Sequence, residues 1–311
     1  MTGEPKVRTV LGDIDPGELG VTNSHDHLFF ASKLLPGQEL DDPTAAAEAL
    51  LHFKTRGGSA LVQWTPYGLT RRTRELAWIS REVGAHVVAA TGLHRAEHYA
   101  PAILGRVIDD LVREFVADLT EGTQPADLPD EPRTGPRAGL VKVAGAFHTI
   151  DSHARLTMTA AAVAHQETGA PIAVHLELGT AALETVELLC SKLDVPPDRV
   201  ILGHLNRNPD ARIQREIAET GVFLGFDGPS RANHATDWRL FDSIETLVEG
   251  GYGGQMLLGG DTTTAAALAQ PGPGYLLTTL APRLTKVLGG DVVTAMLVAN
   301  PARAFATSWL K

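Results

Sequence analysis

The amino-acid sequence predicts an α/β fold, a (β/α)8 TIM barrel with a short N-terminal β-hairpin. The length suits this fold, because 311 residues exceed one ordinary domain but match one barrel. No linker or shift in composition divides the chain, so we expect residues 1–311 to form one domain. The second observation is an alternation. Short apolar runs, each followed by a polar or glycine-rich turn and then a stretch of helical length, recur along the whole chain.

Eight apolar runs are the expected strands of the barrel. Runs such as Val200-Ile201-Leu202 carry no polar side chain on either face, which is typical of a parallel sheet buried on both sides. The predicted strands cover residues 21–27, 59–65, 86–91, 140–146, 171–177, 200–205, 222–227 and 256–261.

Amphipathic stretches of helical length separate these runs. Residues 43–56, 70–83, 152–168 and 211–220 each end at a glycine, which is a common helix terminator. Residues 7–19 carry Gly12, Pro16 and Gly17 and predict the hairpin, and the proline-rich residues 122–138 predict a surface loop. A doubly wound open sheet is the alternative, but no glycine-rich dinucleotide-binding motif follows the first strand.

Composition excludes several classes of protein. The net charge is −10 with no block of lysine and arginine, which disfavours nucleic acid or an anionic membrane as the main partner. The single cysteine, Cys190, rules out an internal disulfide framework and fits a reducing compartment. We see no signal peptide at the start and no apolar run long enough to cross a bilayer, so we expect a cytoplasmic protein.

Polar side chains interrupt the predicted strands at six places. His25 and His27 are two residues apart on one strand and therefore point the same way. Catalytic groups of such barrels lie at the carboxyl ends of the strands, where side chains from different strands converge. Imidazole and carboxylate groups are common ligands of divalent metals. The candidate metal ligands are His25, His27, Lys142, His175, His204 and Asp261.

Each candidate also has a plain structural interpretation. A single histidine is more often a hydrogen-bonded core or surface residue, and Asp261 could cap a helix over residues 262–268. Lys142 could extend to the barrel mouth or pair with Asp261. Alternatively, burial lowers the pKa of this lysine, and a neutral amine can take up carbon dioxide to form a carbamate that bridges two cations. The coincidence of all six residues favours the metal site.

These residues belong to a longer set that runs along the chain, namely residues 10–14, 18–20, 25–27, 141–143, 175, 203–204, 260–261 and 300–305. At these positions the chain resembles the phosphotriesterase family of the amidohydrolase superfamily. The resemblance implies a metal-dependent hydrolase with two divalent cations, usually zinc, bridged by a carboxylated lysine and a hydroxide. It implies that His25, His27, Lys142 and Asp261 bind the more buried metal, and that Lys142, His175 and His204 bind the more exposed one. Asp26 departs from the glutamate that is common at this position.

Within this family the chain resembles the sugar-lactone branch, whose members hydrolyse furanose lactones, some of them phosphorylated. The similar segments are residues 204–210, 226–231, 259–261 and 271–276. Two departures stand out. Asn206 replaces an aspartate, and residues 262–267, Thr-Thr-Thr-Ala-Ala-Ala, replace a stretch that tends to carry arginine and aromatic residues. The second departure removes cationic groups that a phosphorylated substrate would need.

We therefore expect a lactonase in which a metal-bridging hydroxide attacks the substrate and Asp261 carries the proton. A small-molecule substrate and a homodimer are expected, the dimer from the resemblance alone. Alternatives are phosphotriesterase, carboxylesterase or amidase activity at the same site, or a binding barrel without turnover. For each candidate substrate-binding residue, a loop salt bridge or a solvated side chain is an equal alternative. These candidates are Trp64, Tyr67, His94, Arg95, His148, Asp227 and Arg231, with His234 beside them.

Overall fold

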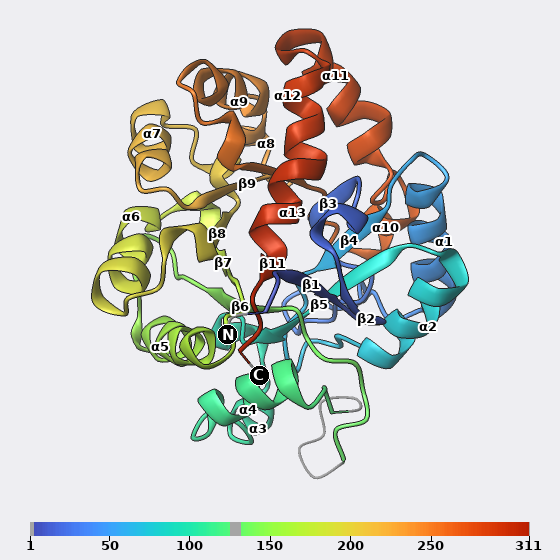
Figure 1. Ribbon diagram of the computed structural model, residues 1–311, viewed down its shortest axis with the longest axis vertical. Coiled ribbons are helices and arrows are strands. Elements are labelled where there is room, and N and C mark those ends of the chain that lie inside the picture. Colours follow the sequence, from blue (N-terminus) through green and yellow to red (C-terminus); the bar gives the residue numbers. More distant parts are fainter. Residues whose placement is uncertain (1–2, 125–131, 311) are drawn as a thin grey trace.

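The computed structural model describes residues 3–124 and 132–310 and contains an eight-stranded parallel sheet that curls into a barrel (Figure 1). The strands follow one another around the barrel in chain order, each parallel to its neighbour. All eight predicted strands are confirmed. They are β3 (Thr22–Asp26), β4 (Ala60–Gln63), β5 (His86–Gly92), β6 (Leu140–Ala144), β7 (Ile172–His175), β8 (Val200–Gly203), β9 (Phe223–Asp227) and β10 (Met256–Gly259).

The barrel closes between its last and first strands. The backbone N–H groups of Gly260 and Asp261 both donate to the carbonyl oxygen of His25, at 2.8 and 3.0 Å. The backbones approach so closely here that a Cβ atom on Gly259 would lie 2.7 Å from the Cβ atom of His25. A glycine at this place therefore brings the residues after β10 next to the predicted ligands of β3.

Side chains inside the barrel alternate with those that face the helices. On β6, Leu140 points into the barrel core and Val141 packs in the layer between strands and helices. The inner layer also contains Val62, Ala173 and Ile201. Because the period of a strand is two residues, Lys142 follows Leu140 on the inner face, at the carboxyl end of the strand.

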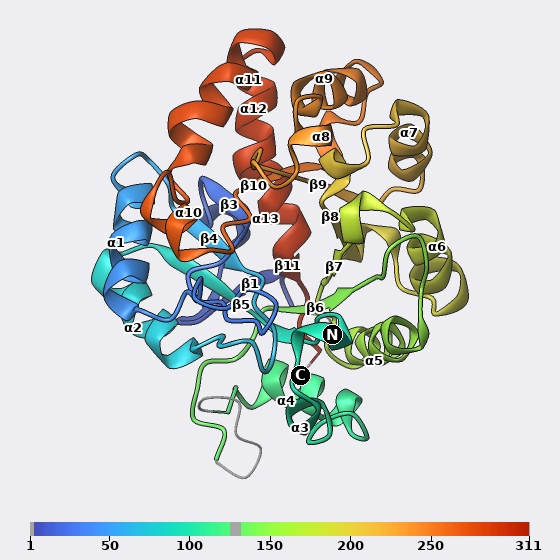
Figure 2. The same cartoon turned by 180° about the vertical axis from the view of Figure 1, so that it is seen from behind.

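Helices surround the strands (Figures 1 and 2). The four predicted helices are confirmed as α1, α2, α5 and α7, although α2 begins three residues later than expected, because Thr70 and Arg72 have positive φ angles of 67° and 41°. The helices are α1 (Pro43–Lys54), α2 (Thr73–Val83), α3 (Pro101–Leu104), α4 (Leu111–Thr120), α5 (Ser152–Thr168), α6 (Ala182–Val186), α7 (Ala211–Glu219), α8 (His234–Asp237), α9 (Leu240–Glu249), α10 (Ala265–Ala269), α11 (Ala281–Leu288), α12 (Gly290–Thr294) and α13 (Asn300–Phe305).

Local capping explains where several of these helices begin. Asp42 and Asp151 accept hydrogen bonds from the first turns of α1 and α5, at 2.8 and 2.7 Å. Helix α10 is capped by the Thr264 hydroxyl, which accepts from the Ala267 N–H group at 3.2 Å. Asp261 is therefore not the cap of this helix and is available to the site.

The predicted N-terminal hairpin is confirmed as β1 (Lys6–Thr9) and β2 (Gly12–Ile14). Strand β1 also pairs with β11 (Ala306–Thr307), so the two ends of the chain lie side by side in both views (Figures 1 and 2). Val7 and Phe305 pack into the inner core of the barrel. The hairpin and the C-terminal segment thereby cover the end of the barrel opposite the site.

Two further expectations concern the surface of the molecule. Part of the predicted loop at residues 122–138 lies outside the described residues, namely 125–131. Within residues 3–124 and 132–310, no helix combines the length and apolar character that a membrane crossing requires.

Candidate metal centre

A cavity of about 600 Å³ opens at the carboxyl ends of the barrel strands, where the predicted ligands meet. All six predicted ligands line it, although they come from five different strands or the turns that follow them. The remaining lining is mostly small or apolar and includes Phe30, Leu35, Ala266 and Ala267. The shared lining residues are His25, His27, Lys142, His175, His204 and Asp261.

Asp227 at the end of β9 orients two of the histidines. Its two carboxylate oxygens lie 2.8 Å from Nδ1 of His25 and 2.6 Å from Nδ1 of His204. Burial alone raises the pKa of Asp227, but the two histidines hold it below its usual range, so the carboxylate only accepts hydrogen bonds. Both histidines therefore carry their proton on Nδ1, and the lone pair of each Nε2 is free to bind a cation.

Thr65 orients the ring of His27, as Asp227 orients His25 and His204. Its hydroxyl donates to the carbonyl oxygen of Phe29 at 2.5 Å and lies 2.7 Å from Nδ1 of His27. Since a hydroxyl has one hydrogen, Thr65 must accept the hydrogen bond from His27. Nε2 of His27 is therefore unprotonated as well, and burial lowers the pKa of this histidine to about 4.

His175 carries its proton on the opposite ring nitrogen, Nε2, from the other three histidines. Its Nε2 atom lies 2.9 Å from the carboxylate of Glu177, which leaves Nδ1 as the unprotonated nitrogen. This Nδ1 atom lies 2.7 Å from Nε2 of His204. Two nitrogen lone pairs therefore face each other, an arrangement that repels unless a proton or a cation lies between them.

Lys142 is 2% exposed and lines the same cavity. Burial lowers its pKa to about 7, with Asp261 acting in the opposite direction. Among the described residues, no hydrogen bond or ion pair of its ammonium group is found. A buried amine of this kind is partly neutral near pH 7, as carbamate formation requires.

Asp261 is the sixth predicted ligand and lies beside the two histidines at the end of the first barrel strand. One of its carboxylate oxygens lies 3.6 Å from Nε2 of His25 and 3.7 Å from Nε2 of His27. The other oxygen pairs with the guanidinium group of Arg207. Despite the opposing effect of burial, Arg207 and His204 hold the pKa of Asp261 well below its usual range, so this group is an anion, as a ligand of a cation must be.

The residues present fit divalent cations. Four ring nitrogens without protons and one carboxylate point into one cavity, and ligand atoms of His25, His204 and Asp261 all lie within 4.8 Å of one another. Nitrogen and carboxylate oxygen are the donors that zinc prefers, at about 2.0–2.2 Å.

Of the seven predicted substrate-binding residues, two line the cavity and five do not. His94 and Arg231 line the cavity. Trp64 stacks beneath the His25 ring at 3.8 Å, and its indole donates to the Ser24 carbonyl oxygen at 2.8 Å, so it supports the site from below. The other candidates, Tyr67, Arg95, His148 and Asp227, are not among the residues that line the cavity.

These four residues have partners elsewhere, and the Arg71 guanidinium lies 5.5 Å from the centre of the Tyr67 ring. The Arg95 guanidinium pairs with Glu97 and Glu177. His148 has a positive φ angle of 54°, and its N–H group donates to the Thr180 hydroxyl at 2.8 Å. Asp227 is held by the histidines described above. Asn206, the other departure from the lactonase pattern, is fully buried and joins β9 to α8 through Asp227 and Asp237.

Three residues of the site were not predicted. His98 lines the cavity and stacks on His94, with ring centres 4.0 Å apart. Arg207 and Glu177 bind Asp261 and His175 as described. A signal for Glu177 was available, because the predicted strand 171–177 contains it, although in the structure β7 ends at His175 and Glu177 begins a 3-10 turn. For His98 and Arg207 no local pattern distinguishes them from other loop residues.

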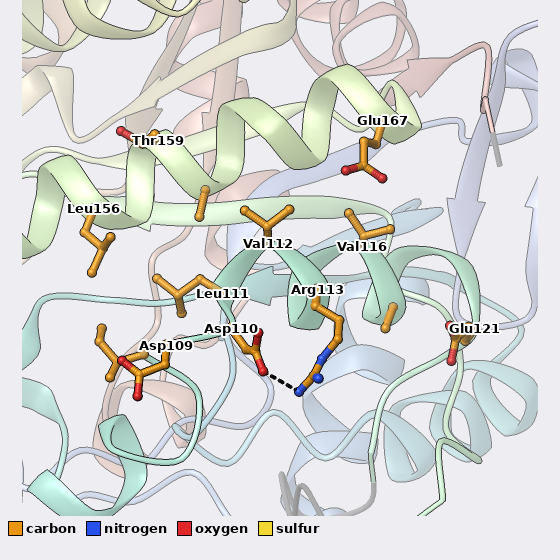
Figure 3. A pocket seen from close by; sticks show the side chains of 13 residues that line it. Asp109, Asp110, Leu111, Val112, Arg113, Val116, Glu121, Leu156, Thr159 and Glu167 are labelled. Carbon is orange, nitrogen blue, oxygen red and sulfur yellow. Dashed lines mark ion pairs between the residues drawn. The ribbon is translucent and has the colours of Figure 1, made fainter.

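A second hollow of similar volume lies on the outside of the barrel, between α4 and α5 (Figure 3). Its walls carry Leu111, Val112 and Leu156, and the charged pair Asp110 and Arg113 lies at its edge, 2.7 Å apart. Among the described residues that line it there is no histidine or lysine. The chemistry therefore favours the cavity at the strand ends as the functional site.

Comparisons with known proteins agree with this geometry. A model of the phosphotriesterase family matches residues 5–305. A phospho-furanose lactonase from Mycoplasmopsis synoviae is 34% identical over a match of 260 residues that covers 78% of this chain and 72% of that protein. An N-acetyltaurine hydrolase from Rattus norvegicus is 24% identical over 90% of this chain and 91% of its own length. The crystal structure of a lactonase from Listeria monocytogenes superposes with a TM-score of 0.86 and 29% identity, covering 96% of this chain and 98% of that chain.

Proposed function

The chain belongs to the phosphotriesterase family of metal-dependent hydrolases, and on this premise we propose that it is a binuclear zinc lactonase that opens a sugar-type lactone. The observation that carries the proposal is the convergence of four unprotonated ring nitrogens, Asp261 and Lys142 in one cavity. A binding barrel without turnover has no need of such a set of ligands beside a proton acceptor.

We assign the ligands as follows. His25, His27, Lys142 and Asp261 would hold the more buried cation, and Lys142, His175 and His204 would hold the more exposed one. Divalent cations at such a site polarise a substrate carbonyl and can lower the pKa of a water from 15.7 to about 7.

Lys142 serves both cations as a carbamate in this proposal. The neutral amine attacks carbon dioxide, a C–N bond forms, and one proton leaves to solvent. The product is a carboxylate on a long side chain that can bridge two cations. Burial of the amine supports this assignment, because a pKa of about 7 leaves part of it neutral near neutral pH.

Asp261 acts as the proton carrier. Its carboxylate accepts the proton of the attacking water and passes it to the alkoxide that leaves when the lactone C–O bond breaks. Arg207 keeps the carboxylate ionised and holds one of its oxygens in place. The other oxygen faces His25 and His27, on the side where the water would be held.

We propose an unphosphorylated substrate, although the relatives from Mycoplasmopsis are named phospho-furanose lactonases. The residues after Asp261 that line the cavity include Thr263, Thr264 and Ala267 and carry no positive charge. Among the described residues that line the cavity, Arg231 is the arginine without a carboxylate partner. One exposed arginine is a weak site for a phosphate dianion but can bind hydroxyl groups or a carboxylate.

A screen of the zinc-loaded protein tests this function. Matched pairs of phosphorylated and unphosphorylated sugar lactones, acyl lactones, N-acyl amides, carboxyl esters and aryl phosphotriesters would be compared by kcat/KM. We expect the highest value for an unphosphorylated sugar lactone. A tenfold higher value for a phosphorylated lactone, an amide or a phosphotriester would replace the proposed substrate. No turnover by protein that holds two zinc ions would leave the binding barrel as the better account.

Amide hydrolysis is the second candidate, because a relative that matches 90% of this chain is an N-acetyltaurine hydrolase. The N-acyl amides in the screen decide between the two reactions. A cytoplasmic location and a homodimer complete the proposal. The dimer rests on the resemblance to the family, and light scattering on purified protein tests it.

A further inference from the structure

We infer that Glu177, held in place by Arg95, is a positioning residue that fixes the ring of His175 so that Nδ1 faces the cavity. This inference rests on the proposed function, since it concerns one ligand of the proposed exposed cation. It also assigns Arg95 a role different from substrate contact.

The first step is the contact between Glu177 and His175. A carboxylate oxygen of Glu177, the first residue of the 3-10 turn Glu177–Gly179, lies 2.9 Å from Nε2 of His175, the last residue of β7. A carboxylate only accepts, so this contact selects the ring form with its proton on Nε2. Rings of metal-binding histidines are commonly oriented by such a carboxylate.

The second step is the attachment of Glu177 itself. Arg95, from the turn after β5, pairs with the same carboxylate oxygen that contacts His175. The other side of the Arg95 guanidinium pairs with Glu97. One arginine thereby joins the ends of β5 and β7 behind the cavity.

The third step is the backbone around Glu177. Leu178 and Gly179 have positive φ angles of 49° and 69°, and a Cβ atom on Gly179 would lie 2.8 Å from the carbonyl oxygen of His204. The Thr180 hydroxyl donates to the carbonyl oxygen of Glu177 at 2.7 Å. The turn is therefore packed against the segment that carries His204. This packing fixes the backbone position from which the Glu177 side chain extends.

The position of the pair excludes a direct role in the reaction. Among the described residues, neither Glu177 nor Arg95 lines the cavity. Their side chains are 26% and 19% exposed and lie beside the metal ligands instead of in front of them. Both charges also act on the pKa of Lys142, in opposite directions, so the contact with His175 is the one through which we expect the pair to affect catalysis.

The experiment compares Glu177→Gln, Arg95→Met and Glu97→Gln with the unaltered full-length protein. Glu97→Gln is the matched control, because Glu97 is 53% exposed and binds Arg95 without a contact to His175. Zinc content and the affinity of each of the two sites are measured by competition with a chelator. Nitrogen-15 NMR of histidine-labelled, metal-free protein, with His175→Asn for assignment, reports which ring nitrogen carries the proton.

We expect Glu177→Gln to weaken one of the two zinc sites roughly 10–100-fold, the usual range for loss of an orienting group, and to leave the other unchanged. In the NMR spectrum His175 should change from a single Nε2-protonated form to a mixture. Arg95→Met should weaken the same site by a smaller factor, and Glu97→Gln should match the unaltered protein.

Three results would overturn the inference. The first is two zinc sites of normal affinity in Glu177→Gln. The second is an unchanged NMR signal of His175 in that variant. The third is an increase of KM in Arg95→Met with normal zinc binding, which would make Arg95 a substrate contact. Failure of the proposed function is seen in the unaltered protein itself, which would then either not bind two zinc ions or bind them without turning over a lactone.

Discussion

The chemistry of the site depends on which nitrogen of each histidine carries its proton. Asp227 and Thr65 select Nδ1–H in three of them, and Glu177 selects Nε2–H in His175. Burial then lowers the pKa of His27, His175 and His204 and keeps the lone pairs of these three rings available at neutral pH. The orienting groups are therefore as necessary to the site as the ligands.

The first prediction concerns Asp261. We expect Asp261→Asn to lower kcat/KM for the best lactone by roughly 10²–10⁴-fold, the usual contribution of a positioned proton acceptor. Zinc content should stay largely intact, because the amide oxygen can still bind a cation. Metal analysis and steady-state kinetics check this, with the exposed Asp242→Asn as the control. Retained turnover would exclude Asp261 as the proton carrier.

The second prediction concerns His98 and the pH dependence of stability. Burial lowers its pKa from 6.5 to about 4, so between these values the unfolded chain binds more protons than the folded one. The stability of the metal-free protein should therefore fall as the pH drops below about 6.5. His98→Gln should reduce this loss by at most about 2 kcal/mol at pH 5.

Urea unfolding of the metal-free protein at pH 7.5 and 5 measures this difference. The exposed His234→Gln serves as control, because His234 lies on the surface. An equal acid-induced loss in His98→Gln and in the unaltered protein would contradict the assignment.

The elements of the barrel bring these residues together at one end. Each of the strands β3, β6, β7, β8 and β10 supplies a proposed ligand, at its carboxyl end or in the turn that follows. The site depends most on the junction of β10 with β3, because His25 and Asp261 meet across it. Gly259 and Gly260 allow this approach.

The third prediction concerns this junction. A Cβ atom on Gly259 would lie 2.8 Å from the carbonyl oxygen of His25, so Gly259→Ala must push the two strands apart. We expect a loss of about 1–3 kcal/mol in the free energy of unfolding. Zinc binding should weaken as well, since the ligands of two strands separate.

Gly253→Ala is the matched control, because its added Cβ atom would meet the nearest neighbour at an ordinary 3.6 Å. Urea unfolding and zinc titration of both variants check the prediction. Equal behaviour of the two variants would show that the junction tolerates a side chain.

At the scale of the whole molecule, the proposed cations join strands from all parts of the barrel. The ligands run from His25 to Asp261, so most of the chain lies between the first and the last of them. A cation that binds the folded state alone stabilises it by mass action, about 2.7 kcal/mol for each site at a free concentration of 100 times Kd.

The fourth prediction is that removal of metal lowers the melting temperature by several degrees. Calorimetry before and after treatment with a chelator measures the change, and addition of zinc with bicarbonate should restore it. Restoration should be incomplete without bicarbonate if Lys142 must form its carbamate again. An unchanged melting temperature after complete removal of zinc would contradict the proposed metal centre.

Much of the architecture could be predicted because its signals are local. Apolar runs of strand length, glycines at helix ends and a hairpin sequence each depend on neighbours in the chain. Helix α2 illustrates the limit of such reasoning. Its start shifts by three residues because Thr70 and Arg72 take positive φ angles in a packed turn, which no pattern in the sequence signals.

The roles of single residues in the loops were less predictable. Asp227 was expected to contact substrate, but it lies beneath two histidines, one of them 202 positions away in the chain. Arg95 was expected in the same role, but it is paired with Glu177 and Glu97. Such partners are decided by packing between loops that are distant in sequence.

The sequence by itself therefore determined the fold class, its strands and the six residues that face one cavity, because alternation along a strand is a short-range property. Only the tertiary structure decided which nitrogen each histidine presents, that Arg207 holds Asp261, and that Asp227 lies behind the site. Apart from the contact of His175 with Glu177, these outcomes depend on contacts between residues from 23 to 202 positions apart. Hydrogen bonds over such separations exist only once the barrel has closed.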